Sequence, residues 1–96
     1  MTPLDSLREK REAILRIAAE HGARNVRVFG SVARGDATGQ SDIDFLVEMT
    51  KGRSLWDLIG FWQDVEDFLG VKVDVVTDGG ISPYLEEKIL AEAIPL

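Results

Sequence analysis

Two short apolar segments that contain aspartates constrain the fold of this 96-residue chain more than any other feature. The alternation in Ser41–Glu48 predicts a strand with Ile43, Phe45 and Val47 on one face and Asp42, Asp44 and Leu46 on the other. The alternation in Val71–Thr77 predicts a second strand, with Lys72, Asp74 and Val76 opposite three valines. A buried carboxylate without a partner is costly, so the fold must provide something for these acids to bind.

The segments around these strands predict a small sheet with helices packed on it. Thr2 and Pro3 predict the start of a helix that runs to His21, with Gly22 as its stop. A strand over Val26–Phe29 follows, and Ser31 is expected to cap a short helix that ends at Arg34. The first helix is expected to bury four residues on one face: Leu4, Leu7, Ile14 and Ala18.

Two further helices complete the predicted order of elements. Ser54 and Asp57 form a capping-box pattern that opens a long helix, and Gly70 closes it. Its expected apolar stripe is Leu55, Leu58, Ile59, Trp62, Val65, Phe68 and Leu69. The last helix begins at Ser82–Pro83 and is expected to place Leu85, Ile89, Ala93 and Ile94 on one face. This order predicts an α+β fold, with a small mixed sheet and helices layered on it, in one domain over residues 1–96.

Composition excludes several classes of site. The chain has no cysteine, which excludes disulfides and thiolate metal sites, and it has one histidine, His21. A histidine-based zinc site and a Ser-His-Asp triad are therefore not expected. Charged residues interrupt the N-terminal segment, and no apolar run is long enough to span a bilayer. We expect a cytoplasmic protein with no membrane partner.

Charge is distributed unevenly along the chain, whose formal net charge is −6. Residues 1–35 carry a net charge of +3, whereas residues 36–96 carry −9. Phosphate neutralisation dominates affinity for nucleic acids, so the acidic part would repel a long RNA or a duplex. Stable binding of nucleic acid is not expected.

The carboxylates predict a metal site. Asp42 and Asp44 project from one face of a strand, with Cα atoms roughly 6–7 Å apart. If the strand that carries Asp74 is a neighbour, three carboxylates meet on that face. Hard divalent cations such as Mg²⁺ prefer oxygen ligands, and three carboxylates are the set that a two-metal phosphoryl- or nucleotidyl-transfer site needs.

The Gly30–Ser31 turn predicts a complementary phosphate site. Glycine lets a phosphate approach the backbone, and the free N–H groups that follow can bind an anion. Arg34, one helical turn further on, can reach the same anion. A phosphate cradle and a metal-binding set of carboxylates joined by one loop are chemically coherent.

These motifs together resemble those of the minimal nucleotidyltransferases, a group of the polymerase-β-like nucleotidyltransferase superfamily. The resemblance rests on Gly30-Ser31-x-Ala33-Arg34-Gly35, Ser41-Asp42-x-Asp44 and Val73-Asp74-Val75-Val76, and it covers nearly the whole chain. It implies the polymerase-β-like palm as the fold. It also implies an enzyme that transfers a nucleoside monophosphate from ATP to a hydroxyl group.

The resemblance implies a role for each motif residue. Gly30 and Ser31 would hold the triphosphate of ATP, with Arg34 as a helper. Asp42 and Asp44 would bind two Mg²⁺ ions. Asp74 would bind the metal on the acceptor side and help to remove the proton of the attacking hydroxyl.

The resemblance further implies a partner, a HEPN-domain ribonuclease toxin in a hetero-oligomeric toxin–antitoxin pair. The chain would then be an antitoxin that transfers AMP to a tyrosine of the toxin. Two alternatives stay open: an antitoxin that neutralises its partner by binding alone, and a nucleotidyltransferase that acts on a small molecule such as an aminoglycoside or on an RNA end.

Overall fold

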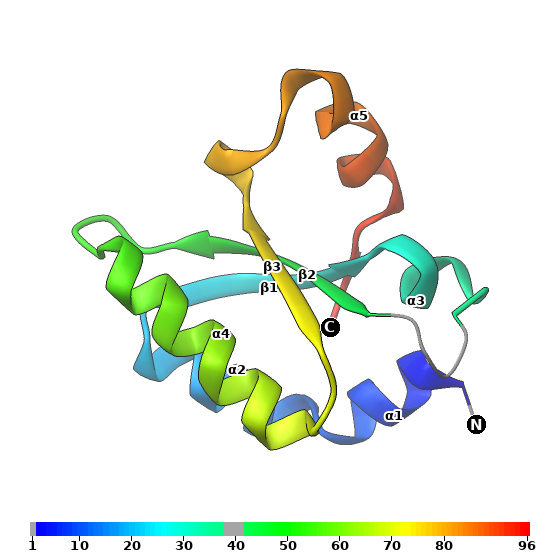
Figure 1. The fold of residues 1–96 in the computed structure, drawn as a ribbon, viewed down its shortest axis with the longest axis horizontal. Helices are drawn as coiled ribbons and strands as arrows, with labels where there is room; N and C mark the ends of the chain where they lie inside the picture. Colours follow the sequence, from blue (N-terminus) through cyan, green and yellow to red (C-terminus); the bar gives the residue numbers. More distant parts are fainter. Residues whose placement is uncertain (1, 38–41) are drawn as a thin grey trace.

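The computed structural model describes residues 2–37 and 42–96 (Figure 1). Its elements in chain order are α1 (Pro3–Glu9), α2 (Arg11–Glu20), β1 (Ala23–Phe29), α3 (Gly30–Arg34), β2 (Ile43–Met49), α4 (Leu55–Leu69), β3 (Val73–Thr77), a 3-10 turn η1 (Asp78–Gly80), α5 (Pro83–Glu92) and β4 (Ile94–Pro95). In the described part of the chain, every helix is too short or too polar to cross a membrane.

The four strands form one mixed sheet in the order β3-β2-β1-β4. β1 pairs antiparallel with both β2 and β4, whereas β2 and β3 are parallel and α4 connects them. This confirms the expected α+β fold, a mixed sheet with helices packed on it. β3 begins at Val73, two residues later than predicted. Val71 and Lys72 precede the strand, and Val71 is exposed.

One face of the sheet carries the main core. Val28, Phe45, Val47, Val73 and Val75 are buried there, under α2 and α4, which lie side by side in Figure 1. The rings of Phe45 in β2 and Phe61 in α4 meet edge to face, with centroids 6.4 Å apart. Leu46 is also fully buried, but it points to the opposite face and lies outside this core.

The first predicted helix is in fact two. The chain breaks at Lys10, whose ψ of 10° ends α1, and α2 begins at Arg11. Leu7 and Ile14 are both buried, as expected, and the break lets α1 contact α3. Leu7 and Ile14 are seven residues apart in sequence and would share a face of one straight helix. The apolar periodicity therefore could not reveal that a break lies between them.

The ends of α4 match the prediction, whereas part of its predicted stripe is wrong. Ser54 and Asp57 form the capping box, and Gly70 ends the helix in the left-handed conformation. Phe61 and Val65 are its buried residues, while Leu55 and Phe68 are exposed. The apolar face of the helix is wider than the part that packs on the sheet, so the pattern did not define which of its apolar residues are buried.

The prediction for the C-terminal segment is also wrong in part. α5 ends at Glu92, Ala93 is extended, and Ile94 pairs with Val28 to add β4 to the sheet. α5 itself has no buried residue, and Leu85 is 52% exposed. Pro95 explains the early end, because the residue before a proline is driven out of the helical region.

Candidate functional site

Asp44 and Asp74 lie directly opposite each other in the parallel pair of β2 and β3. Paired residues project to the same face, which here is the one opposite the main core. Asp42 is half-buried just before the first residue of β2, two positions from Asp44. Ser41, the predicted start of this strand, lies outside the described residues.

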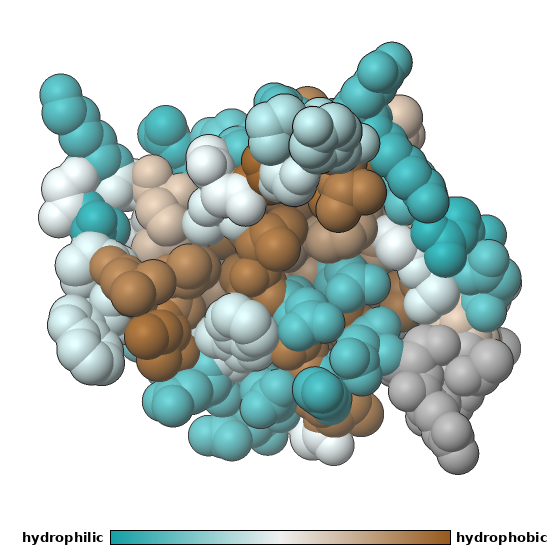
Figure 2. Space-filling view, turned by 45° about the horizontal axis from the view of Figure 1, so that its top comes forward, coloured by the Kyte–Doolittle hydropathy of each residue, from teal (hydrophilic) through white to brown (hydrophobic). Residues whose placement is uncertain are grey.

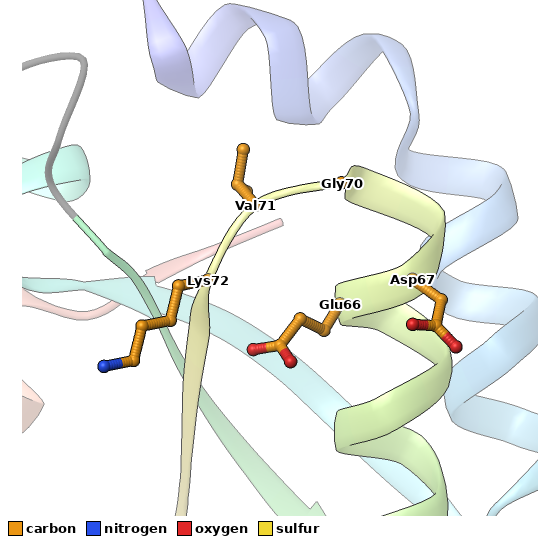
Figure 3. Close-up of a pocket in the computed structure, with 5 residues that line it drawn as sticks. All are labelled: Glu66, Asp67, Gly70, Val71 and Lys72. Carbon is orange, nitrogen blue, oxygen red and sulfur yellow. The ribbon is translucent and has the colours of Figure 1, made fainter.

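The carboxylate of Asp74 stands on an edge strand that α4 holds in place. Both outward-facing backbone groups of Val73 are satisfied by side chains of α4. Trp62 donates from Nε1 to the Val73 carbonyl at 2.7 Å, and the Val73 N–H donates to Oε2 of Glu66 at 3.0 Å. Figure 3 shows Glu66 reaching from α4 toward the strand. Because an edge strand otherwise leaves such groups to solvent, these two bonds fix the position of the next residue, Asp74.

Gly30 lies against the Asp44 carboxylate. Phe29, the last residue of β1, pairs with Asp44, and the chain turns into α3 at Gly30 with a φ of +74°. A Cβ at this position would lie 2.3 Å from Oδ2 of Asp44. Glycine is required both by the left-handed backbone and by this close approach.

The role predicted for Ser31 as a helix cap is wrong. α3 begins at Gly30, two residues earlier than a cap at Ser31 would give; its N-cap is Phe29, and no side chain caps it. The local sequence has a serine where a cap is common, but the left-handed glycine lets the helix start at the end of the strand. Ser31 is instead the second residue of α3, half-buried and next to the Gly30 turn.

Arg34, at the end of α3, is engaged by two carboxylates. It donates from Nε to Asp36 at 3.3 Å and from Nη1 to Glu92 of α5 at 3.1 Å. These hydrogen bonds, that to Asp36 first, raise the pKa of Arg34. Glu92 belongs to the closing pattern Ile89-Leu90-x-Glu92-Ala93-Ile94 of the resemblance, but the sequence assigned it no role, because a glutamate near the end of an amphipathic helix is ordinarily a solvent-facing residue.

Burial and several neighbouring charges shift the pKa of Asp44. Burial raises the pKa of its carboxyl first, followed by the charges of Asp74 and Asp42. Arg34 acts in the opposite sense, and Glu92 adds a further small rise to the same pKa. Asp44 therefore lies within electrostatic range of three other acids and one base.

This donor set fits a divalent cation in its chemistry. Three carboxylates near one another repel, a cation between them relieves that repulsion, and oxygen ligands suit Mg²⁺. Within residues 2–37 and 42–96, however, no three acidic or histidine side chains converge closely enough to form a finished metal site. Asp42, Asp44 and Asp74 lie at the same end of β2 and β3, and their side chains would have to move closer together to bind an ion.

One hollow in the described part of the chain lies away from the candidate residues. This open hollow of about 550 Å³ lies at the turn from α4 to β3 (Figure 3). It is lined by Glu66, Asp67, Gly70, Val71 and Lys72, and by none of the six residues that the motifs single out.

Comparison with known proteins gives a consistent result. Residues 7–96 match the family model described as a nucleotidyltransferase domain. A protein of Methanocaldococcus jannaschii named as a protein adenylyltransferase is 40% identical over 89 residues, which cover 93% of this chain and 96% of the relative. The protein adenylyltransferase MntA of Thermococcus cleftensis is 34% identical over 73 residues, covering 76% of this chain and 74% of MntA.

Solved structures agree with the sequence matches. A structure of a minimal nucleotidyltransferase superposes with a TM-score of 0.87 at 51% identity, covering 100% of this chain and 97% of the other. A crystal structure of a toxin–antitoxin complex with AMP-PNP contains a chain with a TM-score of 0.73 at 20% identity, covering 88% of this chain and 69% of that one. The second likeness, at this identity, is one of fold.

Proposed function

Because this chain belongs to the nucleotidyltransferase family, as one of its minimal members, we propose that it transfers AMP from ATP, with Mg²⁺, to a tyrosine of a HEPN ribonuclease toxin. It would thereby act as the antitoxin of that partner. The relatives named as protein adenylyltransferases support a protein as the acceptor. The likeness in fold to a chain of a toxin–antitoxin complex agrees with a toxin as that protein.

One observation carries the proposal: the pairing of Asp44 with Asp74, with Gly30 against the Asp44 carboxylate. The three residues come from different elements, yet they meet where β1 turns into α3 beside the two parallel strands. A phosphate needs a close backbone approach, and a divalent metal needs oxygen ligands. Their proximity supports a site at which a metal-bound triphosphate meets an acceptor.

We assign the roles accordingly. Asp42 and Asp44 would hold two Mg²⁺ ions together with Asp74, and the ions would supply charge neutralisation at the transferred phosphorus. Gly30 and Ser31 would hold the triphosphate, with Arg34 beside it. The acceptor oxygen forms a bond to the α-phosphorus, the bond to the bridging oxygen breaks, and pyrophosphate leaves. Asp74 would take up the proton of the attacking hydroxyl.

Charge supports a basic protein partner. Residues 36–96 carry the acidic excess, which includes Glu86 and Glu87 at exposed positions of α5. A ribonuclease needs a basic surface to bind RNA, and such a surface complements an acidic one.

Mass spectrometry of the co-purified partner tests the proposal. After incubation with this chain, ATP and Mg²⁺, the partner should gain the mass of AMP on a tyrosine. The Asp42→Asn/Asp44→Asn double variant should leave the partner unmodified while still forming the complex. A partner that gains AMP equally with the double variant would contradict the assignment of the metal site.

A second candidate function, a non-catalytic antitoxin, is favoured by one observation. α5 buries none of its residues, and Tyr84, Leu85 and Leu90 are exposed on it. Figure 2, in which the top of the first view comes forward, shows apolar side chains exposed among hydrophilic ones on this side. A stable complex that silences the toxin without any gain in mass would favour this candidate over the enzyme.

A further inference from the structure

The ion pair between Arg34 and Glu92 links α3 to the otherwise loosely held α5. The distance from Nη1 to Oε1 is 3.1 Å, and the side chain of Glu92 is only 19% exposed, whereas that of Arg34 is 44% exposed. In Figure 1, α5 stands apart from α1, α2 and α4, which lie on the other side of the molecule. The last turn of α5 thus reaches the candidate site through the side chain of Glu92.

A glutamate at this place is unfavourable for the charge balance of the site. It adds a fourth acid to a region that already holds Asp42, Asp44 and Asp74, and it lies within electrostatic range of Asp44. A bound triphosphate would add more negative charge nearby. Direct contact between Glu92 and the nucleotide would therefore oppose binding.

The guanidinium of Arg34, in contrast, is held in a fixed orientation with donors to spare. Its Nε bonds to Asp36 and one N–H of Nη1 bonds to Glu92. Arginine has five N–H donors in a rigid plane, so the two bonds to described residues leave three donors for phosphate oxygens as far as the described part of the chain is concerned. The two acids restrain the plane from both edges and reduce the rotamer freedom that binding would otherwise remove.

We propose that Glu92 is a positioning residue for nucleotide binding, which fixes the guanidinium of Arg34 beside the Gly30–Ser31 turn so that Arg34 binds the β- and γ-phosphates of ATP. This rests on the proposed function. It makes the C-terminal helix part of the nucleotide site through one side chain. It also explains why an acid is placed among acids.

The test is isothermal titration of the chain with a non-hydrolysable ATP analogue and with AMP, both with Mg²⁺. We expect Glu92→Gln to weaken binding of the ATP analogue about 3- to 10-fold, because a lost supporting contact loosens the group it orients. Arg34→Ala should weaken it about 10- to 100-fold. AMP has no β- or γ-phosphate, so its affinity should change little in either variant.

The double variant separates a positioning role from a general effect. Once Arg34 is alanine, Glu92→Gln should cause no further loss, because Glu92 has nothing left to orient. Glu87→Gln removes the same charge from an exposed position of the same helix and serves as the matched control, with unchanged affinity expected. Thermal unfolding of each variant checks that the fold persists.

Two results would overturn the inference. One is an equal loss on Glu92→Gln with and without Arg34, and the other is an unchanged affinity for the ATP analogue in Glu92→Gln. Failure of the proposed function looks different: the unmodified chain itself would not bind the ATP analogue with Mg²⁺, which would remove the basis of both.

Discussion

At the scale of single residues, burial and the charges of Asp74 and Asp42 oppose the ionisation of Asp44 and raise the pKa of its carboxyl. Its pKa is raised, so the folded chain binds a proton more tightly there than the unfolded chain does. This group therefore contributes stability at pH values below the pKa of the unfolded chain. That contribution is lost as the pH rises through the raised pKa of Asp44.

Asp44→Asn should therefore stabilise the metal-free chain at pH 7, by a few tenths to about 1 kcal/mol because the carboxylate is only partly buried. This gain in stability should vanish at about pH 3, where Asp44 is protonated in both the folded and the unfolded chain. Thermal unfolding over a pH series measures this. Mg²⁺ should raise the melting temperature of the unmodified chain and not that of the variant.

Asp57 offers a control of opposite sign for the same measurement. The backbone N–H of Ser54 lowers the pKa of Asp57 in the capping box of α4. Its stabilising contribution is present above the unfolded pKa, so Asp57→Ala should lower the melting temperature at pH 7. A loss of stability for Asp44→Asn at pH 7 would contradict the view that burial and charge repulsion make the Asp44 carboxylate destabilising in the metal-free chain.

At the scale of elements, the edge strand β3 depends on α4 for its alignment. Trp62 and Glu66, one turn apart, satisfy both outward-facing backbone groups of Val73. The helix thereby supplies hydrogen bonds that a further strand at this edge of the sheet would otherwise make. The adjacent residue, Asp74, keeps its place opposite Asp44.

Trp62→Phe should destabilise the chain by about 1 kcal/mol, because it keeps most of the ring and leaves the Val73 carbonyl without its donor. Amide hydrogen exchange should rise in β3 more than in β1. Trp56→Phe is the matched control, since Trp56 is 79% exposed, and it should leave exchange unchanged. Equal exchange of β3 in both variants would show that the bond to Trp62 does not align the strand.

The elements also show how far the sequence alone could lead. Local signals were sufficient for the ends of α4, because Ser54, Asp57 and Gly70 act on their immediate neighbours. The break at Lys10 and the burial of Phe61 were missed because both depend on what the helix packs against. Alternation correctly placed Asp44 and Asp74 on strands, whereas Asp42, also predicted on a strand, lies just before β2. It gave no sign that Glu92 reaches Arg34 from 58 residues away.

At the scale of the whole molecule, the sheet separates two sides with different tasks. Helices α2 and α4 cover one face and provide the core, while the other face carries Asp44 and Asp74 beside the Gly30 turn. The main core therefore lies on the side of the sheet away from the candidate residues. The exposed helix α5, which contacts α3 through Glu92, suits an acceptor that is itself a folded protein.

A crystal structure of the chain with Mg²⁺ and a non-hydrolysable ATP analogue tests the central claim most directly. We predict Mg²⁺ bound by Asp42 and Asp44 at about 2.0–2.1 Å, with the triphosphate against Gly30 and Ser31. A nucleotide bound elsewhere, for example in the hollow beside Glu66 and Lys72, or a metal ion that touches neither Asp42 nor Asp44, would contradict the account.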